Sequence, residues 1–514
     1  MPRQIPFIIA NEGCERFSFY GMRNILTVFL ASTFFATLPA AEAQSEAKEI
    51  FHVFVAGVYF FPLLGGWISD RFFGKYLTIL WVSLVYCIGH ALLAIYENEP
   101  TGFYAGLFLI ALGSGGIKPL VSTFMGDQFD QSNKHLAKLA FDAFYWIINF
   151  GSFFASLFMP KLLAGAGPAA WWGWPAASVA FGIPGVLMLL ATVFFWAGSK
   201  RYVKVPPAPP DPHSFSNVIR TALTARGGAT PGLLLAIAGC VLAVASVAMI
   251  WVLEWKLVIA LCLALVLMLV GVGLGAWIQL EDARGKHPDA AVDGVRSVLR
   301  VLVIFALVTP FWSLFDQKAS TWLFQGEKMT ATWGILPAQM QALNPALVML
   351  IIPFNNFVVY PWLRRRGKEP SQLGRMALGI ALAGVSWIVV GVIQLAIDGG
   401  AALSIIWQLL PYALLTAGEV LVSATGLEFA YSQAPASMKG AIMSFWSLAV
   451  TVGNLWVLIV NVGVKNEAVL GAIERFGVSS MAFQMFFFAV FALLAALAFQ
   501  LVAKNYRVVD NYRR

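Results

Sequence analysis

The chain has 514 residues, of which 59% are hydrophobic and only 12% charged, and its mean hydropathy is +0.76. Soluble proteins carry roughly 25% charged residues, so this composition excludes a soluble enzyme as well as a disordered or fibrous protein. The net charge of +8 comes from cations in short loops, and it gives no reason to expect a nucleic-acid partner. Many blocks of about twenty apolar residues predict an all-α polytopic membrane protein.

In chain order, the apolar blocks predict two sets of six membrane spans with a further pair between them, about fourteen in all. The two sets lie near 12–38, 50–70, 77–96, 101–126, 140–164 and 171–197, and near 295–324, 341–362, 375–397, 403–427, 440–463 and 480–503. Residues 1–200 are therefore predicted to form an N-terminal six-helix bundle and residues 291–514 a C-terminal one. The region 201–290 is predicted to hold a linker, an amphipathic helix on the inner membrane surface at 213–226, and a two-helix hairpin within 231–279.

Lysine and arginine are distributed unequally over the predicted loops. With the N-terminus in the cytoplasm, the inward loops and tails hold roughly four times as many of them as the outward loops. Cytoplasmic loops of membrane proteins carry such an excess, so both termini are predicted to be cytoplasmic. Two six-helix halves are typical of transporters built from repeats, whose binding site lies between the halves.

Two cytoplasmic turns occupy corresponding places in the halves: GGWISDRFFGKY (65–76) after the second span and YPWLRRRGK (360–368) after the eighth. They resemble the inner-loop signature of the major facilitator superfamily, which implies the major facilitator fold. The alternative is an ordinary basic turn.

The first span has the densest set of polar residues: Glu12, Glu15, Arg16, Tyr20 and Arg23. Spacings of three and four place them on one face of a helix. Ionisable groups at membrane depth are unfavourable by at least ~2.5 kcal/mol, so each is a functional candidate. A buried cluster of carboxylates and guanidinium groups can take up and release a proton. The alternative is a static network of ion pairs that fixes the helix.

Other spans also contain ionisable residues. Lys118 lies in the glycine-rich segment GSGGIKPLV (113–121) and is predicted to face a water-filled interior. Asp316, in the seventh span, is its expected counter-ion, and a bridge between the two would join the halves until substrate or a proton releases it. Lys318 is expected to extend toward the outer interface. With Glu419 deep in the tenth span, a substrate with one anionic and one cationic end would fit between the halves.

Several motifs resemble those of the proton-dependent oligopeptide transporters. NEGCERFSFYG (11–21) resembles the family's E-x-x-E-R-F-x-Y-Y-G signature, and GSGGIKPLV, FYWIINFGSFFA (144–155) and GLEFAYSQAP (426–435) resemble further signatures in the same order. Two departures stand out. Phe19 replaces the first signature tyrosine and removes a hydroxyl, and Asp316 stands where many bacterial relatives have a longer Glu.

The resemblance implies a proton-coupled symporter that imports di- and tripeptides by alternating access, with no cofactor other than the coupling proton. It implies proton coupling by Glu12, Glu15, Arg16, His52 and Asp316. It implies peptide binding by Tyr20, Arg23, Tyr59, Lys118, Asn149, Trp312, Asn344, Glu419, Ser423 and Trp446. For His52, the alternative is a hydrogen-bonded position in the core or at an interface.

The loop after the ninth span, IDGGAALS (397–404), lacks the large ectodomain usual in animal members, and the hairpin resembles one common in bacterial members. We therefore expect a bacterial inner-membrane protein that functions as a monomer. Three alternatives stay open: a family relative that carries an amino acid, nitrate or another organic anion; a channel; and a membrane-embedded enzyme. The enzyme is disfavoured because the sequence has no HExxH, GxSxG or paired Asp motif.

Overall fold

The structure, a computed structural model, describes residues 1–130, 133, 136–207, 211–252, 257–368, 370–433 and 439–506. Five of the loop cations that support the predicted orientation lie outside these residues: Lys134, Lys256, Arg507, Arg513 and Arg514. Within the described residues the chain is almost wholly helical, and β-type pairing is limited to two isolated bridges. The all-α prediction is confirmed.

The N-terminal bundle contains six long helical segments joined by short turns. Their bounds are α1 (Ile5–Phe29, continued by η1, Leu30–Phe34), α2 (Ala40–Phe60) with α3 (Pro62–Ile68) and η2 (Ser69–Phe73), α4 (Gly74–Ile95), α5 (Pro100–Gly126), α6 (Ala137–Leu163) and α8 (Ala176–Ala197), with the short α7 (Pro168–Trp172) before the last. The first helix begins at Ile5, seven residues before the predicted start of the first span at residue 12. A proline is well suited to the first turn of a helix, and Ile5 and Ile8 in this turn are buried.

The C-terminal bundle repeats this arrangement, and the predicted hairpin lies between the two. The linker holds α9 (Phe215–Thr224), α10 (Pro231–Val252), α11 (Leu257–Gln279) and η4 (Leu280–Ala283). The bundle consists of α12 (Asp289–Asp316), η5 (Gln317–Ala319), α13 (Thr321–Glu327), η6 (Pro337–Ala342), α14 (Leu343–Phe354), η7 (Asn355–Val359), α15 (Tyr360–Arg365), α16 (Gln372–Asp398), η8 (Ile405–Gln408), α17 (Leu409–Gln433), α18 (Lys439–Gly463), α19 (Glu467–Arg475) and α20 (Ser480–Asn505).

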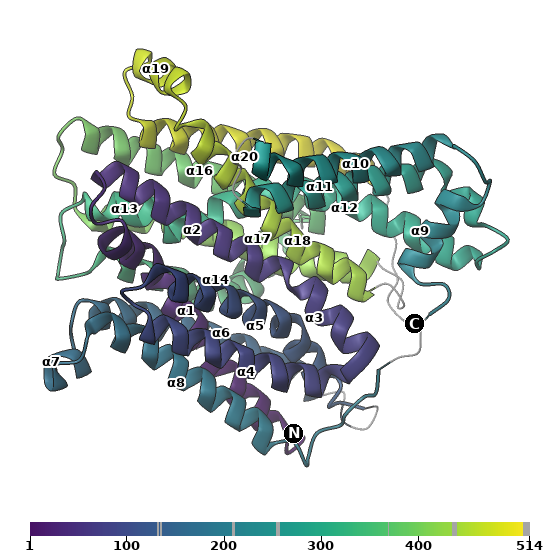
Figure 1. Cartoon of the computed structure of the whole chain (residues 1–514), viewed down its shortest axis with the longest axis horizontal. Coiled ribbons are helices and arrows are strands. Elements are labelled where there is room, and N and C mark those ends of the chain that lie inside the picture. The colour runs from purple at the N-terminus through teal and green to yellow at the C-terminus, as the bar shows by residue number, and fades with distance from the viewer. Residues whose placement is uncertain are drawn as a thin grey trace.

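Twelve segments of the described residues are long and apolar enough to cross a membrane. One of them, Ala40–Ile95, contains two of the predicted spans, and α1 is not among the twelve because charged residues interrupt its apolar sequence. These two points account for the difference from the predicted number of about fourteen. In Figure 1, α9 lies at the right-hand end of the molecule and the N-terminus at its lower edge, whereas α7, α13 and α19 lie toward the left.

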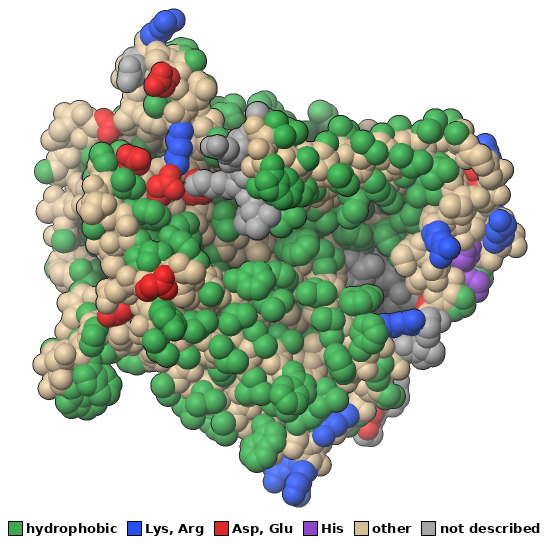
Figure 2. All heavy atoms as spheres, viewed as in Figure 1, with side chains coloured by type: hydrophobic (Ala, Val, Ile, Leu, Met, Phe, Trp, Pro, Cys, Tyr) green, Lys and Arg blue, Asp and Glu red, His purple; other side chains and the backbone are tan. Residues whose placement is uncertain are grey.

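The surface pattern fits a membrane-spanning orientation along this long direction. Figure 2 shows hydrophobic side chains over the middle of the visible face, with charged side chains gathered toward its two ends. Exposed large apolar residues occur on both bundles and on the hairpin, among them Trp81, Leu190, Val241 and Leu497. An exposed apolar belt of this kind is expected where lipid replaces water.

Each bundle has its own hydrophobic core, and small residues bring its helices close together. In the N-terminal bundle, α4 and α5 meet at Gly89 and Gly106. A Cβ atom on either glycine would lie 2.9 Å from the backbone carbonyl oxygen of the other. Because backbone atoms cannot move aside as a side chain end can, this crossing requires glycine.

We expect Gly89→Ala to lower the thermal stability of the purified protein, because the added methyl group would overpack the α4–α5 contact at a cost of ~1–3 kcal/mol. The matched control is Gly66→Ala, since no atom lies within 4 Å of a Cβ there. The measurement is the Tm of both variants in detergent. Equal Tm values for wild type and Gly89→Ala would contradict this description of the crossing.

Candidate functional site

Three ionisable side chains of α1 form a buried cluster. Arg16 Nε lies 2.6 Å from Glu12 Oε1 and 3.2 Å from Glu15 Oε2. Among the described residues, neither carboxylate oxygen of Glu15 has a hydrogen-bond partner. One guanidinium group therefore serves two carboxylates, and it forms a hydrogen bond only with Glu12. The second carboxylate is available to a proton or to a new donor.

An ion pair joins the two bundles across the centre of the molecule. Arg23 Nη2 of α1 lies 2.6 Å from Asp316 Oδ1 at the end of α12, and both side chains are almost fully buried. The second oxygen of Asp316 accepts a hydrogen bond of 2.7 Å from Asn454 Nδ2 of α18. Asp316 is thus held by one residue from each bundle.

This ion pair continues into a hydrogen-bonded chain that reaches α2. His52 Nδ1 lies 2.6 Å from Asn454 Oδ1, and His52 Nε2 lies 3.0 Å from Ser320 Oγ. The His52 side chain is fully buried. Asn454 therefore connects the imidazole to the carboxylate of Asp316, and the predicted coupling residues His52 and Asp316 lie in one network.

Lys118 does not form the predicted bridge to Asp316. Its Nζ lies 3.6 Å from the centre of the Phe19 ring and 4.8 Å from that of Tyr59, and no ion pair joins it to Asp316 among the described residues. That expectation is wrong for this conformation, because Arg23 already pairs with Asp316 and two aromatic rings stabilise the ammonium group. Phe19, which lacks the signature hydroxyl, contributes one of these rings.

The second bundle holds a shorter polar chain. Asn344 Nδ2 donates to Glu419 Oε2 at 2.5 Å, and Lys318 Nζ donates to Asn344 Oδ1 at 2.8 Å. The prediction that Lys318 extends to the outer interface is wrong: its side chain is buried, and its Nζ lies 3.2 Å from the centre of the Phe315 ring. The chain turns inward after α12, so Lys318 faces the site.

Aromatic and amide side chains complete the site. The rings of Trp312 and Trp446 meet edge to face with centroids 6.1 Å apart, and Trp312 Nε1 has no hydrogen-bond partner among the described residues. The same holds for Ser423 Oγ. Asn149 Nδ2 donates to the Tyr145 carbonyl oxygen at 3.0 Å, which leaves its second N–H and its Oδ1 for another partner. Unpaired donors beside apolar rings suit a ligand with polar ends and variable side chains.

Burial separates the predicted site residues into two groups. The residues expected to couple protons are buried: Glu12, Glu15, Arg16, His52 and Asp316. Six of those expected to bind peptide are only half-buried: Tyr20, Tyr59, Lys118, Asn344, Glu419 and Ser423. The other four residues expected to bind peptide, Arg23, Asn149, Trp312 and Trp446, are buried like the coupling residues, so burial separates the two groups only in part.

Comparison with known proteins agrees with this geometry. The model of the POT family matches residues 76–476. Solute carrier family 15 member 2 of Mus musculus is 33% identical over 410 residues, which are 77% of this chain and 50% of that protein. Peptide transporter 3 of Caenorhabditis elegans is 34% identical over 77% of this chain and 51% of its own length. The chain thus spans about half the length of the curated relatives it matches.

The chain belongs to the POT family. Among solved structures, the in meso crystal structure of the POT family transporter PepTSo has 64% identity and a TM-score of 0.94, with both chains fully covered. A crystal structure of an auto-inhibited POT family peptide transporter has 63% identity and the same TM-score, covering 100% of this chain and 99% of that one. The family and the major facilitator fold predicted from the motifs are confirmed, and the family is one of transporters rather than enzymes.

Two residues of the POT site were missed by the sequence analysis. Asn454 is a polar residue within the otherwise apolar segment AVTVGNLWVL (449–458), and that position alone could have identified it. Lys318 follows Asp316 by two residues, but no sequence signal shows that the helix ends at Asp316 and turns it inward.

We expect the losses of stability caused by Arg23→Gln and Asp316→Asn to be non-additive, with the double variant less destabilised than the sum of the two single variants. Each single substitution leaves one buried charge without its partner, which is unfavourable by ~3–5 kcal/mol, and the double substitution removes both charges. The measurement is the Tm of the two single variants and the double variant in detergent.

Lys118→Gln combined with Asp316→Asn is the matched control, and its coupling should be clearly weaker, because no ion pair joins those two residues among the described ones. Additive losses for Arg23 with Asp316, or strong coupling of Lys118 with Asp316, would contradict the assignment of this ion pair.

Proposed function

We propose that this chain is a proton-coupled symporter that imports di- and tripeptides across the bacterial inner membrane by alternating access. We further propose that it functions as a monomer with both termini in the cytoplasm, and that the proton is its coupling ion with no other cofactor. The observation that carries the proposal is that one bundle contributes a half-buried cation to the site, Lys118, and the other a half-buried carboxylate, Glu419.

The two ends of a peptide match these two groups. Every di- or tripeptide has a carboxylate, an ammonium group and at least one amide, whatever its side chains. Lys118, whose ammonium group lies against the rings of Phe19 and Tyr59, would receive the carboxylate, and Glu419 would receive the ammonium group. Glu419 disfavours a simple anion such as nitrate, because it would repel a second negative charge.

Proton coupling would act through the ion pair between the bundles. Protonation of Asp316 would remove its negative charge and release Arg23, which could then bind the peptide carboxylate beside Lys118. The hydrogen bonds from His52 to Asn454 and from Asn454 to Asp316 would orient the carboxylate that takes up this proton. An inside-negative potential adds ~2.3 kcal/mol per charge per 100 mV, enough to concentrate a neutral zwitterion that moves with one proton.

The first functional prediction concerns the glutamates of α1. In proteoliposomes, Glu12→Gln and Glu15→Gln should abolish uptake of labelled dialanine driven by a proton gradient, while counterflow exchange continues. Glu467→Gln, on the exposed start of α19, is the control and should leave driven uptake unchanged. If both activities fall together in the α1 variants, the glutamates are structural.

The second functional prediction concerns the ends of the substrate. Dialanine amidated at its C-terminus should compete ~10-fold or more worse than dialanine, because a charge-assisted hydrogen bond is worth ~1.5–3 kcal/mol. In Lys118→Gln this difference should largely disappear, whereas the penalty for acetylating the N-terminus should remain. Equal competition by capped and free dialanine against the wild-type protein would refute the peptide site.

A further inference from the structure

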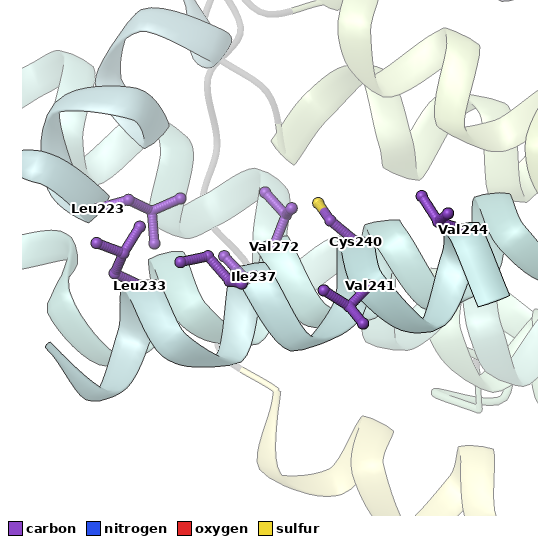
Figure 3. Close-up of a pocket in the computed structure, with 8 residues that line it drawn as sticks. Leu223, Leu233, Ile237, Cys240, Val241, Val244 and Val272 are labelled. Carbon is purple, nitrogen blue, oxygen red and sulfur yellow. The ribbon is translucent and has the colours of Figure 1, made fainter. Parts of the chain in front are cut away.

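The inserted hairpin carries an apolar groove on its outer face. The groove has a volume of about 510 Å³, and its lining includes Leu223 of α9, Leu233, Ile237, Val241 and Val244 of α10, and Val272 of α11. Figure 3 shows these side chains along α10, with Leu223 and Val272 beside them. Ile237, Val241 and Val244 are exposed, so the groove opens away from the protein core.

The groove continues into a second hollow of about 380 Å³ against the amphipathic helix α9. The two share Leu223, Leu233 and Val272, and the second is also lined by the polar residues Ser216, Arg220 and Thr224. The apolar groove therefore ends beside one cationic side chain and two side chains with hydroxyl groups.

The length of the groove matches one leaflet of a bilayer. From Leu233 to Val244, α10 rises by about 17 Å, and half of the hydrocarbon thickness of a bilayer is ~15 Å. The polar end lies at α9, which the predicted topology places at the inner membrane surface. The groove thus has the depth of one acyl chain of the inner leaflet, with Arg220 at headgroup level.

Arg220 is available to a ligand, whereas the charges near it are neutralised. No ion pair involves Arg220 among the described residues. By contrast, Arg226 Nε lies 2.7 Å from Asp282 Oδ2, and Glu281 pairs with Arg284 and Arg296. The nearby carboxylates are therefore occupied, and a negative charge at the end of the groove would meet an unpaired cation.

We propose that this groove binds a phospholipid with an anionic headgroup, with one acyl chain along α10 and the phosphate beside Arg220. Basic pockets between membrane helices on the cytoplasmic side are suited to such headgroups. The hydroxyl group of Ser216 lies at the same end, whereas that of Thr224 donates to the Arg220 carbonyl oxygen at 2.8 Å. The site lies on the hairpin and α9 and includes none of the residues assigned above to peptide or proton.

Native mass spectrometry of the full chain in detergent tests the headgroup. Dioleoyl phosphatidylglycerol should be retained about fivefold better than dioleoyl phosphatidylcholine, the difference expected for one cation near an anionic lipid. Arg220→Gln should remove this preference, and Lys286→Gln, which removes an equal charge from an exposed loop outside the groove, should preserve it. Equal retention of the two lipids by the wild type, or equal effects of the two substitutions, would overturn the proposal.

Two further experiments test whether the acyl chain occupies the groove. Val241→Trp would fill the groove and should reduce phosphatidylglycerol retention severalfold, whereas Leu242→Trp, on the neighbouring exposed face of α10, should not. Excess inorganic phosphate should not displace the lipid. Unchanged retention in Val241→Trp would overturn the proposal, and displacement by phosphate would show that the site binds a free anion instead.

Discussion

The contact between Arg23 and Asp316 is the interaction on which the arrangement of the two bundles depends. It places opposite charges 2.6 Å apart in the buried centre of a membrane protein, one from each bundle. Either charge alone would be strongly unfavourable there. As long as both are ionised, α1 and α12 are therefore held together. The same carboxylate connects through Asn454 to His52, so the network around Asp316 joins four helices, α1, α2, α12 and α18.

Weaker contacts surround this ion pair on the side of α13, which is predicted to be extracellular. Thr27 Oγ1 donates to the Ala319 carbonyl oxygen at 2.8 Å, Gln341 Nε2 donates to that of Asn24 at 3.1 Å, and Lys48 Nζ donates to Gln484 Oε1 at 2.8 Å. A neutral hydrogen bond contributes only ~0.5–1.5 kcal/mol net, and one from a charged group such as the Lys48 ammonium ~1.5–3 kcal/mol. A second ion pair also joins the bundles on this side, because Lys465 Nζ, after α18, lies 2.6 Å from Glu46 Oε1 and 3.5 Å from Glu49 Oε2 of α2. This side is thus closed by the buried ion pair at Asp316, by a more exposed one and by several hydrogen bonds, and neutralising Asp316 would break the buried one.

Composition and apolar block length predicted the fold closely. In lipid, the backbone N–H and C=O groups must be hydrogen-bonded within the protein, and helices achieve this within each apolar block. Residue spacing likewise predicted the Glu12–Arg16 pair, since i, i+4 neighbours on a helix must meet. Pairing across the bundles could not be predicted in this way. Lys118 and Arg23 both lie at the depth of Asp316, and only the packed structure shows that aromatic rings occupy the space around Lys118. The turn that buries Lys318 is equally a property of the tertiary structure.

The central claim is that the ion pair between Arg23 and Asp316 keeps the α13 side closed until Asp316 is neutralised. Spin labels at Ala36 and Ala331, both exposed and on opposite bundles, would report the separation of the bundles on that side by pulsed electron paramagnetic resonance. The four natural cysteines would first be replaced. With ionised Asp316 we predict a single short distance, and with Asp316→Asn an additional longer one. An identical distance distribution in both proteins would contradict the account.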